Sequence, residues 1–195
     1  FSARRAAKTL KELPPELLPD ILALIDNERV GRLIERADPD DAVTFIDSLP
    51  ETRREEVMAL LDPEQRDEVR ELISYPEGTV GRIMKTDLMA LPPTTTAQGA
   101  IDKIRERGEL ETFFYLYVVE QENILAGVVP IRNLVIAPPD RTLGELMIAD
   151  PIRANVFMDQ EEAARLVGKF GLLALPIVDE GGRLEGIITV DDVID

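Results

Sequence analysis

Two kinds of hydrophobic pattern divide the chain. Over residues 1–75, apolar positions such as Val57, Met58, Leu60 and Leu61 recur at helical spacing. Prolines followed by acids mark the helix starts, because proline is tolerated at the first helical position and an acid there suits the positive end of the helix dipole. These starts lie at 14–16, 39–40, 50–51 and 63–64. The pattern predicts an all-α superhelical array of short helices, each stacked on its neighbours.

Local signals refine this prediction. Asp38 and Asp62 precede two of the prolines as plausible N-caps, and Gln65, three residues after Asp62, completes a capping-box pattern. Pro19 must lie in the first turn of its helix or kink that helix.

From residue 76 onward, short segments rich in Val, Ile and aromatic residues alternate with helical patterns. The candidate strands are residues 113–120, 125–129, 155–158, 173–179 and 184–189, and the candidate helices are residues 97–107 and 160–170. Three segments of this half recur in the same order about 60 residues later: 80–84 in 143–147, 117–120 in 176–179, and 127–133 in 186–192. One supersecondary module is therefore used twice.

Composition narrows the chemistry. The chain of 195 residues is 45% hydrophobic, which is typical of a folded protein, and it contains neither Cys nor His. Disulfides, thiolate or imidazole metal sites and nucleophile–His arrangements are thereby excluded, so the sequence predicts a protein that is not an enzyme. No apolar run approaches the roughly 20 residues that cross a bilayer.

Acidic residues dominate both halves. The formal net charge is −16, with 11 basic and 18 acidic residues in 1–75, and 11 and 20 in 76–195. This balance argues against nucleic acid as a partner, because phosphate binding needs a basic face. Carboxylate oxygens remain available for hard divalent cations.

Each repeat resembles a CBS module, a β-α-β-β-α unit that pairs with its copy. The resemblance rests on a strand that ends in Val-Asp or Val-Glu, a glycine turn, and a Gly-hydrophobic-hydrophobic-Thr-x-x-Asp segment before the last helix. Residues 186–192 fit this segment completely, whereas residues 127–133 carry Pro130 in place of Thr or Ser. The implied fold class is α+β: a helical array followed by a tandem CBS pair.

The combination of parts resembles the cytosolic region of the MgtE family of magnesium channels. It is carried by the acidic helical array, the segment Tyr-Pro-Glu-Gly-Thr-Val-Gly-Arg-Ile-Met at 75–84, and the two repeats. The resemblance implies a helical N domain at 1–75 and CBS repeats at 76–137 and 138–195. It also implies a homodimer formed through the CBS domains, at the cytoplasmic face of a membrane. The chain starts with Phe and stops within an expected helix, so we expect a fragment whose own transmembrane pore domain is absent.

The resemblance further implies which carboxylates bind Mg²⁺. Asp40 would bridge to Asp192 through one ion, and Asp159, Glu161, Asp195 and Asp41 are further candidate metal ligands. The alternative for each is a helix-capping or dipole-complementing role. Two family carboxylate positions are occupied here by Gly171 and Thr44, and a third falls near Lys8. Some of the family's ions are therefore expected to be absent, shifted to Asp41 or Asp47, or held through water.

The same resemblance implies an ATP site in which Tyr115 contacts the adenine, and Arg132 and Asn133 lie near the ribose and phosphates. Asn133 stands where Asp is usual and accepts hydrogen bonds less strongly. The alternative is a strand aromatic and a surface arginine. No Walker pattern supports nucleotide hydrolysis.

Three functions stay open at this point. In the first, Mg²⁺ bridges acidic faces of the N and CBS domains and favours the closed state of a magnesium channel. In the second, the chain is an adenine-nucleotide-sensing CBS module that regulates another protein. In the third, it is an interaction scaffold that responds to neither ligand.

Overall fold

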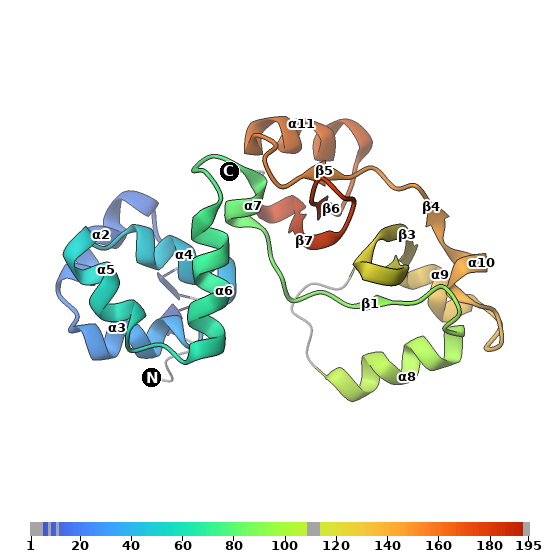
Figure 1. The fold of residues 1–195 in the computed structure, drawn as a ribbon, viewed down its shortest axis with the longest axis horizontal. Helices are drawn as coiled ribbons and strands as arrows, with labels where there is room; N and C mark the ends of the chain where they lie inside the picture. The colour runs from blue at the N-terminus through green and yellow to red at the C-terminus, as the bar shows by residue number, and fades with distance from the viewer. Residues whose placement is uncertain (1–5, 8, 11, 109–113, 193–195) are drawn as a thin grey trace. The chain divides into compact units, whose positions relative to one another are not determined.

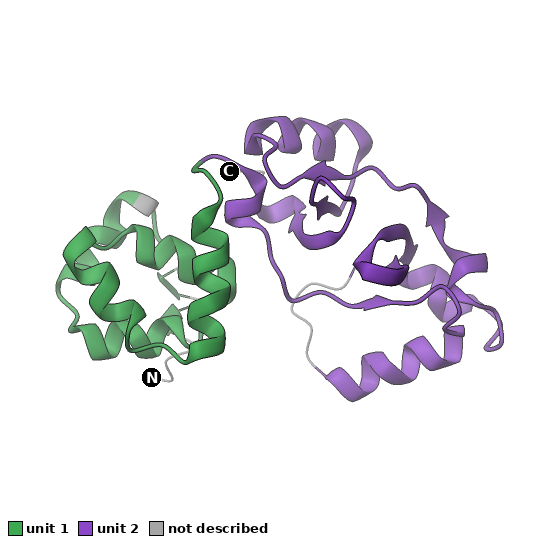
Figure 2. Cartoon of the chain, viewed as in Figure 1, with its two compact units in different colours: residues 1–77 green, residues 78–195 purple. Residues whose placement is uncertain are grey.

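The structure is a computed structural model that describes residues 6–7, 9–10, 12–108 and 114–192 (Figure 1). It contains two compact units, residues 1–77 and residues 78–195 (Figure 2), and each is considered by itself.

Unit 1 consists of short helices, as the proline–acid starts predict. They are η1 (Pro15–Leu17), α2 (Leu18–Ala23), α3 (Asn27–Ile34), α4 (Pro39–Asp47), α5 (Glu51–Met58) and α6 (Pro63–Ser74). Pro19 lies in the first turn of α2, which confirms one of the two placements expected for it. Helix α3 has no proline start, and the Asp26 side chain caps it by accepting a hydrogen bond from the Arg29 amide at 2.9 Å.

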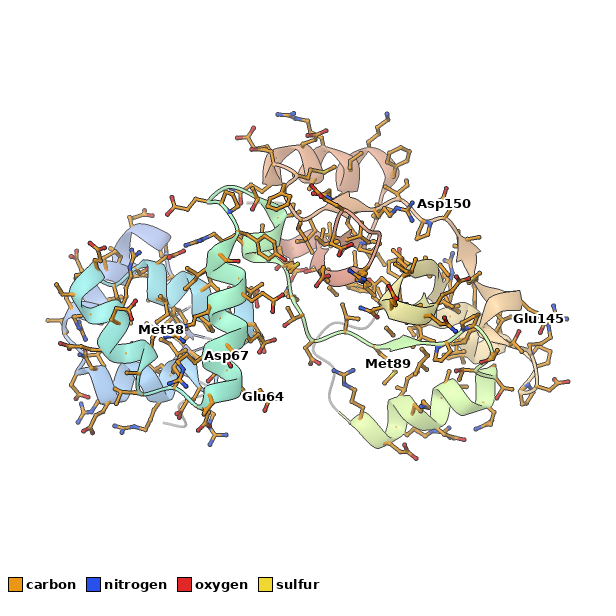
Figure 3. The ribbon with its side chains drawn as sticks, viewed as in Figure 1. Met58, Glu64, Asp67, Met89, Glu145 and Asp150 are labelled. Carbon is orange, nitrogen blue, oxygen red and sulfur yellow. The ribbon has the colours of Figure 1, made fainter. Side chains whose placement is uncertain are left out.

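The unit is held together by a buried apolar interior and by arginines that bind helix ends. Figure 3 labels Met58, Glu64 and Asp67. The Met58 side chain is buried, with 5% of its surface exposed, whereas Glu64 and Asp67 on α6 are exposed. The Arg53 guanidinium donates to the carbonyl oxygens of Leu22 and Ile25, at 3.0 and 2.7 Å. It thereby ties α5 to the carbonyls that end α2, where helices leave acceptors unsatisfied.

The capping box predicted at Asp62 is wrong. The Asp62 side chain makes no cap hydrogen bond, and Gln65 instead donates to the Ile34 carbonyl oxygen at 2.8 Å. The Ile34 carbonyl oxygen near the end of α3 also accepts from the Ala37 amide at 3.1 Å, so Gln65 adds a second donor there and tertiary contact prevails over the local pattern.

Unit 2 contains two sheets, one for each repeat. The first has the order β1-β2-β3-β4, with β1 (Ala90–Leu91), β2 (Tyr115–Val119), β3 (Leu125–Pro130) and β4 (Ile148–Ala149). The second has the order β5-β6-β7, with β5 (Ala154–Asn155), β6 (Ala174–Val178) and β7 (Leu184–Thr189). In both sheets a parallel pair is followed by an antiparallel hairpin, so the internal repeat seen in the sequence is a repeat of structure.

Helices complete the repeats. The two predicted helices are confirmed as α8 (Ala97–Arg107) and α11 (Gln160–Phe170). Unit 2 also contains shorter helices: α7 (Val80–Ile83), η2 (Gln121–Asn123), α9 (Ile131–Ile136), α10 (Leu143–Leu146) and η3 (Val190–Asp192). The strand predicted over 155–158 is wrong beyond residue 155, because the Asn155 side chain accepts from the Phe157 amide and turns the chain toward α11. Residue 113 of another predicted strand lies outside the described residues.

The leader of each repeat packs on the other repeat. Leader 1, residues 78–85, joins the second sheet: Lys85 and Ile187 exchange backbone hydrogen bonds of 2.8 and 2.9 Å. Leader 2, residues 142–149, joins the first sheet through β4, which pairs with β3. Figure 3 labels Glu145, which lies in leader 2, and Asp150, which directly follows leader 2. Since each repeat needs the other's leader, the two repeats form one unit.

Hydrophobic clusters join the two repeats. One cluster lies under α8 and includes Leu116 and Leu134, Met89, which is labelled in Figure 3, and Leu143 of leader 2. A second cluster lies between the two sheets and holds Tyr117 of the first repeat with Ile187 of the second. The repeats are also joined at their turns, where Arg183 forms an ion pair with Glu122 at 3.0 Å.

Candidate functional site

The candidate metal ligands of unit 1 lie at the start of α4. Asp40 and Asp41 occupy its first turn after Pro39, and both are partly buried. This position complements the positive end of the helix dipole. Thr44, where the resemblance led us to expect a carboxylate, donates its hydroxyl to the Asp40 carbonyl oxygen at 3.2 Å and faces solvent.

Two candidate ligands of unit 2 have local structural roles. The Asp159 carboxylate caps α11 by accepting from the Glu161 amide at 2.8 Å and from the Glu162 amide at 3.3 Å. The Glu161 side chain pairs with Arg165 one turn later, at 3.2 Å. Both side chains are exposed, so oxygen lone pairs remain accessible to an ion.

Asp192 is engaged by three donors. One carboxylate oxygen lies 2.6 Å from the Lys85 ammonium, and the other accepts from the Thr189 amide at 2.7 Å and from its hydroxyl. The side chains of Lys85 and Asp192 are only 13% and 12% exposed. Lys85 was missed by the sequence reasoning, although the repeat gives a signal: its counterpart in leader 2 is the apolar Ile148.

Two other positions bear on the predicted sites. Asp195 lies outside the described residues. Gly171, where the resemblance led us to expect an Asp, ends α11 in the left-handed conformation with φ of 59°, where glycine is favoured.

The residues fit magnesium unevenly. Among the described residues no three acidic side chains gather into a metal cluster. Mg²⁺ keeps several waters and usually takes one or two carboxylates, so it does not require such a cluster. The donor chemistry at Asp40 and Asp41 suits it, whereas at Asp192 a divalent ion meets a cation that is already in place.

The candidate nucleotide residues come together in the first repeat. Tyr115 is the register partner of Pro130, and Arg132 and Asn133 follow in the first turn of α9. Tyr115 and Asn133 are partly buried and Arg132 is exposed. This places an aromatic ring, a cation and an amide near one end of the β2–β3 hairpin, although Asn133 offers no charge to a ribose.

Two protein-family models match this chain. Residues 80–140 and 143–195 each match the family model of the CBS domain, so unit 2 is a CBS pair. Residues 1–78 match the model of the MgtE intracellular N domain.

The chain belongs to the MgtE family and corresponds to its cytosolic region. It is 34% identical to the magnesium transporter MgtE of Thermus thermophilus, over 98% of this chain and 43% of that protein. It is 31% identical to MgtE of Bacillus subtilis, over 94% of this chain and 41% of that protein. These relatives are transporters rather than enzymes, and the chain spans about two fifths of their length.

A solved structure extends the likeness to the fold. The cytosolic domain of the Mg²⁺ channel MgtE in complex with ATP matches with a TM-score of 0.93 and 33% identity, covering all of this chain and 80% of that one. The α+β class is therefore confirmed, with the helical region ahead of the CBS pair. Among the described residues, no helix has the length and apolar character needed to cross a bilayer.

Proposed function

We propose that the chain is the magnesium-sensing part of a magnesium channel or transporter, attached to its own transmembrane pore at the cytoplasmic face of the membrane. At high Mg²⁺ the ions bridge Asp40 or Asp41 of unit 1 to the acidic residues of unit 2 and favour the closed state. At low Mg²⁺ the like charges repel and the closed arrangement is lost. The observation that carries this proposal is the family match along both units, joined to a net charge of −16.

The mechanism is a shift between two arrangements. A ligand moves such an equilibrium only by its difference in affinity for the two states. A carboxylate on each unit supplies that difference, because the ion gains its second protein ligand only when the units approach. Each such site is weak, so several are needed for a steep response to free Mg²⁺.

Limited proteolysis tests this proposal. Mg²⁺ should slow cleavage at residues 74–80, between the two units, more than NaCl at equal ionic strength does. The double variant Asp40→Asn, Asp192→Asn should lose most of this protection. Equal cleavage rates with and without Mg²⁺ would contradict the switch.

Homodimerisation through the CBS domains is part of the same proposal. Val135 and Ile136 on α9 are 67% and 81% exposed, and Phe170 at the end of α11 is 48% exposed. Exposed apolar side chains on the helices of a CBS pair support an interface there. Analytical ultracentrifugation of the chain and of Ile136→Ser tests it: the variant should shift toward monomer.

A second candidate function is adenine-nucleotide sensing. It is favoured by the register that brings Tyr115 close to Arg132 and Asn133, and by the ATP complex of the similar MgtE domain. In this case ATP should bind without added Mg²⁺, and Arg132→Gln should weaken it by about tenfold, because a charge-assisted contact to phosphate is lost. Calorimetry with Arg105→Gln as the control, which removes an exposed arginine of α8, measures this.

A further inference from the structure

The contact between leader 1 and the end of the second repeat contains a charge pair, Lys85 with Asp192, that has no counterpart at the equivalent positions Ile148 and Asn133. Lys85 follows α7, and Asp192 lies in η3, 107 residues later. The Lys85 ammonium lies 2.6 Å from Asp192, 2.9 Å from the Thr189 hydroxyl oxygen and 4.0 Å from Asp191. Thr189 is fully buried. The ammonium thus sits among carboxylate and hydroxyl oxygen atoms.

The two repeats differ at this place in a correlated way. Leader 2 carries Ile148 at the position of Lys85, and the first repeat carries Pro130 and Asn133 at the positions of Thr189 and Asp192. Ile148 is 53% exposed and pairs in β4 with Val128, as Lys85 pairs with Ile187. The backbone geometry is therefore shared, and the positive and negative charges occur together or not at all.

Charge balance explains why the pair is kept together. A carboxylate that is 12% exposed is costly to hold without a counter-charge. A divalent ion bound to the free lone pairs of Asp192 would lie within a few ångströms of the ammonium, where repulsion between cations is strong. Lys85 and a divalent ion therefore compete for the same carboxylate.

We propose that Lys85 is a built-in counter-cation that holds Asp192 in the absence of divalent ions and sets how much Mg²⁺ is needed to engage it. The competition rests on the proposed function, because it concerns the Mg²⁺ ligand assigned to unit 2. The counter-cation role rests on the geometry alone. Mg²⁺ binds Asp192 only as Lys85 withdraws, so Lys85 raises the Mg²⁺ concentration of the response.

Hydrogen exchange of the whole chain provides a local readout, since the amides of Lys85 and Ile187 bond to each other's carbonyl oxygens. The chain, Lys85→Gln, Asp192→Asn and the double variant are compared, with Lys103→Gln as a control that removes an exposed lysine of α8. Without divalent ions, Lys85→Gln and Asp192→Asn should each speed exchange at these amides. The double variant should be little worse than either, because one contact is lost in all three.

Addition of Mg²⁺ then tests whether Lys85 competes with the ion for Asp192 or only pairs with Asp192. In Lys85→Gln, Mg²⁺ should slow exchange at these amides, because it supplies Asp192 with the missing cation. It should do so at a concentration about tenfold below the one that changes exchange in the parent chain, where it must first displace Lys85, and the effect should vanish in the double variant. Equal Mg²⁺ dependence in the parent chain and Lys85→Gln would overturn the inference, as would unchanged exchange in Lys85→Gln without Mg²⁺. Proteolysis of the parent chain reports separately on the switch between units, so failure of the proposed function is recognised independently.

Discussion

At the scale of single residues, Tyr117 of unit 2 carries a buried hydroxyl group. It is 2% exposed between the two sheets, and among the described residues its hydroxyl has no hydrogen-bond partner. A buried hydroxyl without a partner costs about 1–3 kcal/mol of desolvation. Burial also raises the pKa of this phenol, and the neighbouring Tyr115 adds to the shift.

Tyr117→Phe should therefore stabilise the chain by about 1 kcal/mol at neutral pH, because it removes the hydroxyl and keeps the ring. The raised pKa means that the folded chain holds its proton while the unfolded chain releases it above about pH 10. Stability of the parent chain should fall as pH rises through that range, and less so in the variant. Urea unfolding at pH 8 and at pH 10.5 measures both effects. A variant less stable than the parent at pH 8 would show that the hydroxyl has a partner.

Individual site residues were harder to predict than their surroundings. The Asp159 motif was correctly placed at the entry to α11, but the sequence shows only that an acid stands there, and capping and metal binding both favour an acid. Asp192 was predicted as a ligand without its partner Lys85, because the two residues are 107 positions apart. Contacts at that separation depend on how the leaders cross, which no local pattern encodes.

At the scale of elements, two glycines allow the leaders to cross. A Cβ at Gly186 would lie 2.8 Å from the Lys85 carbonyl oxygen and from the Met84 side chain. A Cβ at Gly127 would lie 2.7 Å from Met147 and 2.8 Å from the Ile148 carbonyl oxygen. The methionine of each leader thus packs over the glycine of the other repeat. The repeated segments Gly-Arg-Ile-Met and Gly-Glu-Leu-Met supply the methionines of these two contacts, and Gly186 and Gly127 supply the glycines.

Gly186→Ala should destabilise unit 2 by about 1–3 kcal/mol, because backbone as well as side chain must shift to admit the methyl group. The control is Gly168→Ala in α11, where a Cβ would meet nothing within 4 Å and alanine is the better helix former. That variant should be stabilised by about 0.5–1 kcal/mol. Thermal unfolding followed by circular dichroism compares them. Equal midpoints for the two variants would argue against the crossing of leaders.

Elements with a strong local signal were predicted well. The ranges of α8 and α11 were predicted, and the strand cores of β2, β3, β6 and β7 lie within the predicted segments, apart from one residue at the end of β3. The two-residue strands β1, β4 and β5 were missed or overextended, because so short a segment shows no alternation. Helix α3 escaped because its cap, Asp26, has no following proline. The missed strands are places where pairing with another segment defines the element.

At the scale of the whole molecule, charge governs the expected behaviour. Both halves carry an excess of acids, so screening by any salt relaxes their repulsion, whereas only a bound ion can link two carboxylates. The radius of gyration from small-angle scattering should therefore fall further in Mg²⁺ than in NaCl of equal ionic strength. Lys85→Gln should move the midpoint of this change to lower Mg²⁺, since Asp192 then lacks its own cation.

Two double variants, measured by the same small-angle scattering experiment, distinguish an ion that bridges the units from general screening of charge by salt. Asp40→Asn with Asp192→Asn removes one proposed ligand from each unit and should abolish most of the difference between the two salts. Glu64→Gln with Asp140→Asn removes the same two charges at exposed positions, again one in each unit, and should leave the difference in place. If both double variants lose it alike, net charge rather than a bridging ion sets the response. If the parent chain shows no difference between the salts, the acidic surfaces serve solubility, and adenine-nucleotide sensing becomes the better account of the CBS pair.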